Sequence, residues 1–307
     1  MNRSTLILIA VLVVLAVLAY LLYPSEGERE TSYKTVNLNV SVDSSTVTKL
    51  DIQRPGKAVT LENVGGTWMV TSPVRYKANL SSVTALISSL SKFKVGTLVS
   101  SNPDKQSTFQ VDSASATRLT ATDRSGKSLA LLVGKTGPSY SEVYFRVPTS
   151  NDVYVGDGLS PWTLNLDVKD WRDRTIFSVP QDSIKGLDIA YKNNVHVYRK
   201  AGPTWFAGSD TIPPATITNP LATLANLQAE NFVDTIPKIA TTPLSIKITS
   251  GDQVAIDFYP MPPDSAKYCV RTSKSDQYFT VAKYIPQQFI DLTNKGPKVE
   301  RPSGKKK

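Results

Sequence analysis

The chain has very little sulfur or imidazole chemistry available to it. Its 307 residues include one cysteine, Cys269, and one histidine, His196. A single cysteine excludes an intramolecular disulfide and a cysteine-rich zinc site, and a single histidine excludes a metal site built from several histidines. No cysteine follows the apolar N-terminal stretch, so a lipid anchor of the bacterial lipoprotein type is not supported. We therefore expect no metal and no cofactor.

Positive charge is in excess, and part of it is concentrated at the C-terminus. The net charge is +9, and the last three residues are all lysine. We interpret residues 293–307 as a basic, disordered tail. The alternative is contact with anionic lipid headgroups or another acidic envelope surface. The aromatic residues alternate as in strands and are not interleaved with a basic stripe, so we expect no nucleic-acid partner.

One long run of the sequence has no charged residue. It covers residues 5–23, begins at Thr5 and ends with Leu22 and Tyr23. As a helix it would span about 28 Å, close to the thickness of the hydrocarbon core of a bilayer. Because Arg3 precedes the run, the positive-inside rule places the N-terminus in the cytoplasm. We predict a single-pass membrane anchor with the rest of the chain outside the cytoplasm. A cleaved signal peptide is the alternative.

After a polar tether, residues 24–46, the sequence repeats itself. The tripeptide Leu-Asp-Ile at residues 50–52 recurs 137 residues later, at 187–189. Trp68 recurs at the same interval as Trp205. Such self-similarity at a fixed interval indicates two copies of one structural unit.

Each copy combines strands with one expected helix. Alternating apolar residues predict an antiparallel meander before the helix and more strands after it. Apolar residues recur at helical spacing over residues 83–93, and Asn219 and Pro220 supply an N-cap and a first helical position in the second copy. The predicted fold class is therefore α+β, with an N-terminal transmembrane helix followed by two tandem repeats, residues 47–165 and 166–292. Each repeat is a mainly antiparallel sheet with one packed helix.

Several short segments carry a family resemblance. They are packing and turn positions: Trp68-x-x-x-x-Pro73, Tyr76, Ala78, Phe93, Gly126-Lys127, residues 131–134, Tyr144-x-Arg146, residues 153–155 and Arg172-Asp173-Arg174-Thr175. On these residues the chain resembles the bacterial DUF4340 family of uncharacterised proteins. The resemblance implies a single-anchor protein of the bacterial cytoplasmic (inner) membrane. It also implies an accessory role beside ABC transporter components of the gliding-motility type.

The motifs that could carry chemistry are incomplete, so we expect no catalytic residue and no enzyme. Residues 134–136 resemble the end of a phosphate-binding loop, but Leu129 stands where that loop requires glycine. A second series follows the order of penicillin-binding protein motifs, yet it is crowded into about 50 residues, too few for that fold: Ser89-x-x-Lys92, Ser100-x-Asn102 and Lys135-Thr136-Gly137.

Five further positions have a structural and a functional interpretation. A Ser-His-Asp arrangement would have to use His196, which we interpret as a surface position on an alternating strand. Asp51 and Asp188 repeat between the copies and are interpreted as turn or edge-strand residues. Trp68 and Trp205 are interpreted as core anchors that cover the helices. The alternative for both is an exposed aromatic platform for a glycan or peptide.

The sequence favours a non-catalytic accessory protein outside the cytoplasm, with a protein partner in an ABC-type envelope transport or gliding-type complex. The alternative is a binding module for an envelope glycan, lipid or peptide, and the sequence identifies no small-molecule ligand. An open sheet edge would favour the protein partner. A concave cleft lined by tryptophan or tyrosine, with convergent polar groups, would favour the ligand.

The membrane prediction is tested by fractionation. Because residues 5–23 have the length and apolarity of a single span, the protein should remain with membranes and resist alkaline carbonate extraction. Protease added to spheroplasts should digest the chain beyond about residue 30. Recovery of a soluble form that begins near Tyr20 would establish a cleaved signal peptide instead.

Overall fold

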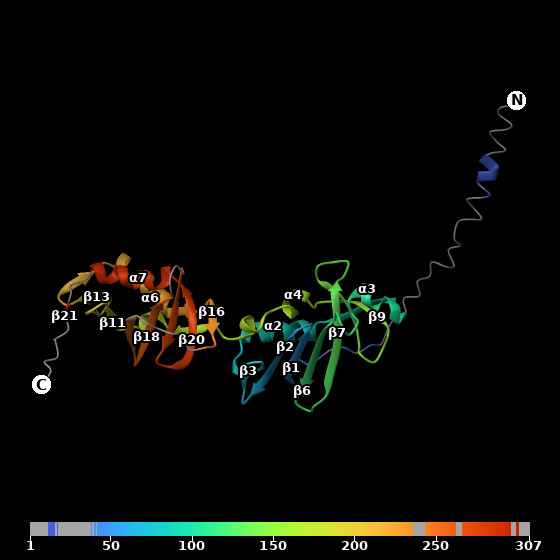
Figure 1. The fold of residues 1–307 in the computed structure, drawn as a ribbon, viewed down its shortest axis with the longest axis horizontal. Helices are drawn as coiled ribbons and strands as arrows, with labels where there is room; N and C mark the ends of the chain where they lie inside the picture. Colours follow the sequence, from blue (N-terminus) through green and yellow to red (C-terminus); the bar gives the residue numbers. More distant parts are fainter. Residues whose placement is uncertain are drawn as a thin grey trace, which may run out of the picture. The chain divides into compact units, whose positions relative to one another are not determined.

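The computed structural model divides the chain into two compact units, each with one large sheet (Figure 1). The first unit comprises Met1–Tyr76 and Leu80–Leu166, and the second comprises Lys77–Asn79 and Asp167–Lys307. The structure describes residues 12–15, 17, 38, 40, 42–235, 243–261, 266–295 and 299–300.

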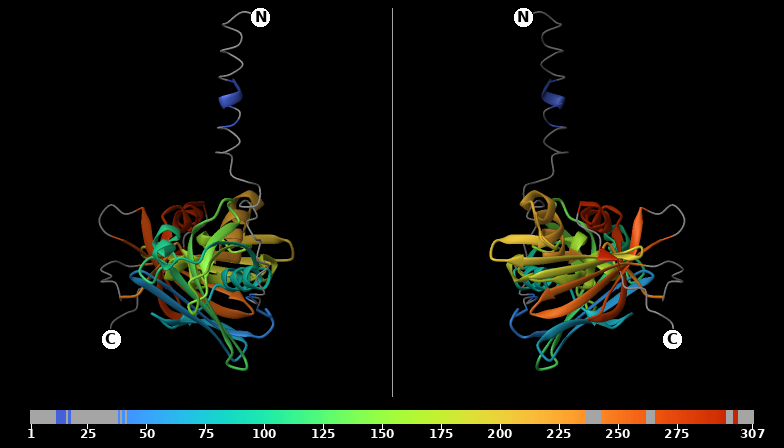
Figure 2. Two further views of the ribbon diagram at one scale, coloured as in Figure 1. Left: turned by 90° about the vertical axis from the view of Figure 1, so that its right-hand side faces the viewer. Right: turned by 90° about the vertical axis from the view of Figure 1, so that its left-hand side faces the viewer.

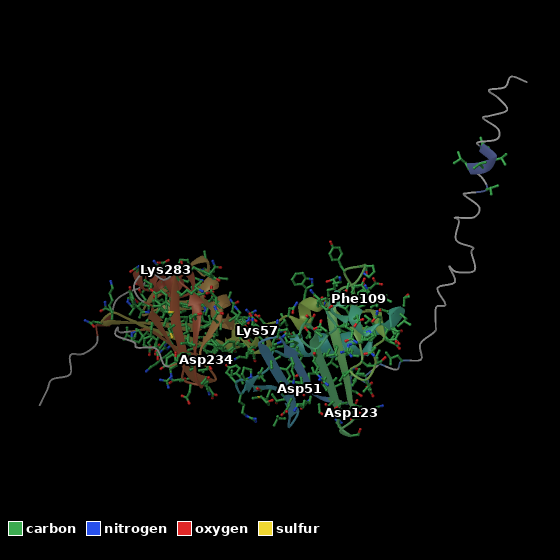
Figure 3. All side chains as sticks on the ribbon, turned by 45° about the vertical axis from the view of Figure 1, so that its right-hand side comes forward. Asp51, Lys57, Phe109, Asp123, Asp234 and Lys283 are labelled. Atoms are coloured by element: carbon green, nitrogen blue, oxygen red, sulfur yellow. The ribbon has the colours of Figure 1, made fainter. Side chains whose placement is uncertain are left out.

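The sheet of the first unit has nine strands in the order β4-β3-β2-β1-β6-β7-β8-β9-β5. Two hairpin systems meet where β1 pairs with β6 in antiparallel fashion. Asp123 lies at the β6–β7 turn (labelled in Figure 3), where its carboxylate accepts hydrogen bonds from the N–H groups of Ser125 and Lys127. The elements are β1 (Val47–Arg54), β2 (Lys57–Val64), β3 (Thr67–Ser72), β4 (Tyr76–Lys77), α2 (Leu80–Ser91), β5 (Lys94–Ser100), η2 (Pro103–Lys105), α3 (Gln106–Phe109), β6 (Thr117–Asp123), β7 (Ser128–Thr136), β8 (Glu142–Arg146), β9 (Val153–Asp157) and α4 (Pro161–Leu164).

The sheet of the second unit has ten strands, nine of them in the order β14-β13-β12-β11-β17-β18-β19-β20-β16, with β21 paired to β12. Strands β10 and β15 form a separate two-stranded antiparallel sheet. The elements are α5 (Val168–Trp171), β10 (Thr175–Ser178), η3 (Gln181–Ser183), β11 (Gly186–Tyr191), β12 (Asn194–Ala201), β13 (Thr204–Ala207), β14 (Asp210–Ile212), α6 (Pro214–Ala225), β15 (Asn226–Gln228), β16 (Asn231–Val233), β17 (Leu244–Ser250), β18 (Asp252–Pro260), β19 (Lys267–Thr272), β20 (Ser275–Ala282), α7 (Tyr284–Lys295) and β21 (Val299–Glu300).

The two sheets repeat one strand order, from the short edge strand through the meander to the last strand. The registers repeat as well. Leu50 in β1 pairs with Leu61 in β2, and Leu187 in β11 pairs with Tyr198 in β12. These pairs join residues at the same separation along the chain, so the duplicated sequence segments occupy equivalent places in their sheets.

The predicted α+β fold class is wrong, because the described part of the chain is mostly β. Stretches without a clear alternation, such as Lys94–Ser100, also form strands, which extends both sheets. The second unit has two twelve-residue helices, not one, and α6 and α7 contact each other (Figures 1 and 2). Among the described residues, no helix is long and apolar enough to cross a membrane. Of the predicted span, only residues 12–15 and 17 are described.

The helices of the second unit differ from the prediction for a physical reason. α6 begins at Pro214, so that proline, and not Pro220, takes the place near the helix start where a missing N–H is tolerated. Pro220 lies inside the helix and is buried. α7 has buried Phe289 and Leu292, and it extends to Lys295, inside the segment interpreted as a tail. Residues 301–307 of that segment lie outside the described residues.

Tyr198 connects α7 to the sheet. Its side chain is fully buried in β12, and its hydroxyl donates a 2.9 Å hydrogen bond to the carbonyl oxygen of Leu292 in α7. Burial disfavours the phenolate and raises the pKa of Tyr198 to about 12. The hydroxyl therefore stays protonated across the physiological range.

Burial of the Tyr198 hydroxyl predicts an alkaline loss of stability. An unfolded tyrosine titrates near pH ~10, and the folded group titrates at about 12. Between these values the unfolded state binds fewer protons, so the free energy of unfolding falls as the pH rises. Tyr198→Phe should cost about 1 kcal/mol at neutral pH, and should then lose less stability than the wild type from pH ~10 to ~12.

Denaturant unfolding of both proteins at several pH values measures the difference. Tyr140→Phe is the matched control, because that tyrosine is 94% exposed. An equal alkaline loss in wild type and Tyr198→Phe would contradict the assignment.

Candidate functional site

Strand β5 forms one edge of the first sheet. It has seven residues, whereas the other outermost strands, β4, β14 and β16, have two or three. Its pairing with β9 is irregular, with register shifts on both sides of Leu98, and the Val99 side chain is 39% exposed. A long edge strand presents backbone N–H and C=O groups on its outer side, which can pair with an added strand.

A hollow of about 330 Å³ lies elsewhere on the first unit, beside α4. Trp162 on this helix is 77% exposed, whereas Leu164 at the helix end is buried. Arg54 donates hydrogen bonds to the carbonyl oxygens of Asn165, at 2.9 Å, and Leu166, at 2.7 Å. These contacts hold the end of α4 in place, while the indole of Trp162 on the same helix faces solvent. The lining residues are Gln110, Ser115, Thr117, Val133, Gly134, Lys135, Thr136, Pro161, Trp162, Leu164 and Asn165.

The Lys135 side chain lies near two aromatic rings. Its Nζ lies 5.9 Å from the ring centroid of Phe109 (labelled in Figure 3) and 5.8 Å from that of Tyr144. The two ring centroids are 4.8 Å apart, and their attraction for the ammonium is of the cation–π type. At Gly134 an added Cβ would lie 2.1 Å from the carbonyl oxygen of Phe109, so this close approach requires glycine. Residues 134–136 are thus the end of strand β7, not a phosphate-binding loop.

The two repeated tryptophans are buried in their sheets. Trp68 in β3 is 9% exposed and Trp205 in β13 is 5% exposed. A hollow of about 350 Å³ in the second unit is lined by Trp205, and the ion pair of Asp182 with Lys200, at 3.4 Å, also lies there. The low exposure of both indoles favours their interpretation as core anchors, which stays a prediction. The remaining predicted positions, Thr5, Leu22 and Tyr23, lie outside the described residues.

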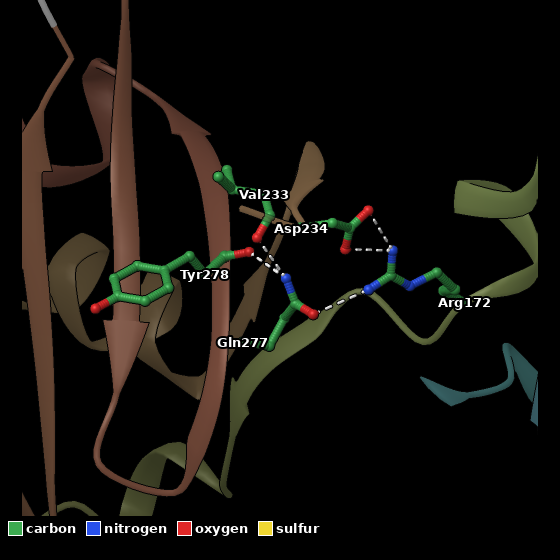
Figure 4. Close-up of polar contacts among 5 residues, drawn as sticks. All are labelled: Arg172, Val233, Asp234, Gln277 and Tyr278. Atoms are coloured by element: carbon green, nitrogen blue, oxygen red, sulfur yellow. Dashed lines mark hydrogen bonds and ion pairs between the residues drawn. The ribbon is translucent and has the colours of Figure 1, made fainter. Parts of the chain in front are cut away.

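Arg172 is the centre of a buried polar cluster in the second unit (Figure 4). It is 2% exposed, and its guanidinium donates to the carboxylate of Asp234 at 3.0 Å and to Oε1 of Gln277 at 3.0 Å. Its Cζ lies 3.6 Å from the ring centroid of Phe232. The Gln277 amide in turn donates to the carbonyl oxygen of Val233. The cluster joins the segment before β10 to strands β16 and β20. We interpret it as a set of contacts that stabilise the second unit.

Asp173, the next residue, is also fixed by hydrogen bonds. Burial raises the pKa of its carboxyl, but the hydrogen bonds from Lys77 and Thr175 outweigh burial, so the pKa lies below its ordinary value. The Lys77 Nζ lies 2.9 Å from this carboxylate, and the backbone N–H of Thr175 donates to it at 3.0 Å. The carboxylate thus stays ionised and holds the turn that leads into β10.

The sequence motifs with catalytic precedent have local roles. Ser100 Oγ accepts a hydrogen bond from the N–H of Asn102, and the Asn102 side chain accepts one from the N–H of Asp104, which caps η2. Within the described residues, no group of three or more His, Cys, Asp or Glu side chains could hold a metal ion. Cys269 is buried, and burial raises the pKa of its thiol.

His196 and the repeated aspartates do not lie where the sequence placed them. His196 is 3% exposed, on the same face of β12 as Tyr198, because α7 lies over that face. Asp51 and Asp188 lie in the central strands β1 and β11, not at turns or edges. Asp51 accepts a 2.7 Å hydrogen bond from Thr60, and Asp188 pairs with Arg199, so each carboxylate links neighbouring strands.

Comparison with models of protein families gives a match. A family model described as a domain of unknown function (DUF4340) matches residues 68–247, which is more than half of the chain. No curated protein and no solved structure matches the chain.

The Arg172 cluster predicts a sharp difference between two neighbouring arginines. Arg172→Ala removes charge-assisted hydrogen bonds and leaves Gln277 with an unfilled acceptor. The change should cost about 1.5–3 kcal/mol in the unfolding of the second unit. Arg174→Ala is the matched control, because Arg174 is exposed and should change stability by less than about 0.5 kcal/mol.

Thermal and denaturant unfolding of the two variants measures this difference. Equal stability of Arg172→Ala and Arg174→Ala would show that the cluster contributes little, and that its buried arginine has another role.

Proposed function

The chain belongs to the DUF4340 family, and we propose that it is a non-catalytic accessory subunit that binds another protein of a bacterial envelope complex. The complex is of the ABC-type transport or gliding type. The protein is held at the inner membrane by residues 5–23, with the described units outside the cytoplasm. Its role is to position or stabilise a partner, not to carry out a reaction.

The single observation that carries this proposal is the edge strand β5. Seven residues in extended conformation cover roughly 24 Å, enough to pair with an added strand of similar length. Main-chain hydrogen bonds would supply affinity, and the partly exposed Val95, Leu98 and Val99 would supply apolar contacts. The occupant proposed for β5 is therefore an extended segment of a partner protein.

A second candidate function has an observation of its own. The exposed Trp162 beside a polar-lined hollow has the character of a ligand site, which favours a binding module for an envelope glycan. The two functions use different elements of the first unit, so each can be tested without the other.

The β5 proposal predicts a site-specific cross-link in living cells. A photoreactive amino acid in place of Val99, 39% exposed on β5, should cross-link to one component of an envelope transporter. The same amino acid in place of Val64, 44% exposed at the end of β2, is the matched control and should not. Val99→Lys should weaken recovery of that component with the protein, since a charge at the strand edge opposes strand addition.

The outcomes are decisive when the variants accumulate to wild-type levels. The accessory role is supported if the protein cross-links to one transporter component from position 99 and if Val99→Lys weakens recovery of that same component. No cross-link from Val99, or equal cross-linking from both positions, would contradict the role of β5.

A further inference from the structure

Trp162 differs from the other tryptophans of the chain. It is 77% exposed, whereas Trp68, Trp171 and Trp205 are 9%, 0% and 5% exposed. A single exposed apolar side chain is ordinary on a protein surface. This one, however, lines a hollow of about 330 Å³, a volume within the range of small-molecule sites.

The backbone beneath the indole is held from three sides. Pro161 restricts the start of α4, buried Leu164 anchors its end, and the Arg54 guanidinium binds the carbonyl oxygens of the two residues that follow. An aromatic ring on a fixed short helix loses little further freedom when a ligand binds. The site is in this sense preorganised.

The rest of the lining complements a polar ring with an apolar face. Gln110 and Asn165 each supply an amide donor and acceptor, and Thr136 supplies a hydroxyl. Buried Val133 and Leu164 form an apolar floor. A pyranose ring has the same combination, because its C–H groups can lie on an aromatic face while its hydroxyls point sideways to hydrogen-bond partners.

The charge of the hollow narrows the ligand class. Among the described residues that line it, Lys135 is the one with a charge, and none of them carries a carboxylate. The Lys135 ammonium lies 5.9 Å from the ring centroid of Phe109 and 5.8 Å from that of Tyr144. A cation with no carboxylate among the described lining residues favours an anionic group on the ligand.

We propose that this hollow binds a carboxylate-bearing saccharide of the cell envelope, with one sugar ring stacked on Trp162 and its carboxylate directed to Lys135. The proposal rests on the second candidate function, the glycan-binding module, and does not depend on β5. It assigns to Trp162 the role of an exposed aromatic platform, which the sequence analysis gave as the alternative for Trp68 and Trp205.

The test is a fluorescence titration of the purified protein, because Trp162 is the exposed tryptophan and its emission should respond to a stacked ring. The probe is the disaccharide of N-acetylglucosamine and N-acetylmuramic acid, which carries a carboxylate. Its neutral match is N,N′-diacetylchitobiose. We expect the acidic disaccharide to bind about tenfold more tightly than the neutral one.

Three variants separate the contributions. Trp162→Ala should weaken binding of both disaccharides about tenfold or more, measured by calorimetry since the fluorophore is lost. Trp162→Phe should restore part of that loss. Lys135→Gln should remove the preference for the acidic disaccharide while leaving the neutral one unchanged. Tyr140→Ala is the control, because this 94% exposed residue does not line the hollow.

Each result bears on the proposal. Acid-selective binding that is lost in Trp162→Ala and loses its selectivity in Lys135→Gln supports it. Absence of binding to both disaccharides at millimolar concentration overturns it, as does binding that survives Trp162→Ala in a protein with a wild-type melting temperature. If position 99 gives no cross-link but the saccharide still binds, the accessory role is contradicted and the saccharide proposal stands.

Discussion

The structure depends on one type of non-local strand pairing, made once in each unit. β1 pairs with β6 and β11 pairs with β17, and each pairing joins two hairpin systems that are far apart in the sequence. The facing residues include Ile52 with Leu119 and Ile189 with Ile246, and all four side chains are at most 1% exposed. Since a strand shifted by one residue turns every side chain to the other face, these buried pairs fix the register of the whole sheet.

This central pairing determines where binding can occur. Strands in the middle of each sheet have neighbours on both sides, so their backbone groups are committed to the ladder. The proposed binding elements lie outside this ladder: β5 is an outermost strand of the first sheet, and α4 lies beside the hollow. Both proposals therefore concern elements outside the central pairing of β1 with β6, which supplies the scaffold that presents them.

The sequence could predict the meanders because local signals agree there. Glycine turns, β-branched residues and period-two alternation all point to the same strands, and the duplicated tripeptides at residues 50–52 and 187–189 occupy equivalent registers. It could not predict β5, because the alternation of that segment is interrupted at Gly96 and Thr97 and the strand is defined by its pairing with β9. The order of strands in a sheet is a tertiary property and leaves little trace in short windows.

The wrong prediction for His196 and the lack of any prediction for Trp162 have a common origin. In the segment Val195-His196-Val197-Tyr198 both phases of the alternation carry large side chains, so the pattern alone does not say which face is inside. α7 buries the face with His196 and Tyr198, and that helix was not predicted, although Phe289 and Leu292 at helical spacing could have indicated it. In the same way Trp162, in the joint between the copies, has no repeat partner and no periodic context, so its exposure could not be read from the sequence.

The family match covers the elements proposed to bind a partner or ligand, but only part of the contacts that stabilise the fold. Residues 68–247 include β5, α4 and every residue that lines the Trp162 hollow. They include Arg172 and Asp234 but not Gln277, and Tyr198 but not Leu292. A fold that completes its second sheet with residues beyond the matched region uses those residues for closure and stability. The first unit is completed in the same way, because Arg54, which holds the end of α4, and the strands β1 and β2 lie before the matched region. Both units therefore use residues outside the matched region for stability, whereas the two proposed binding elements, β5 and the lining of the Trp162 hollow, are formed by residues inside it.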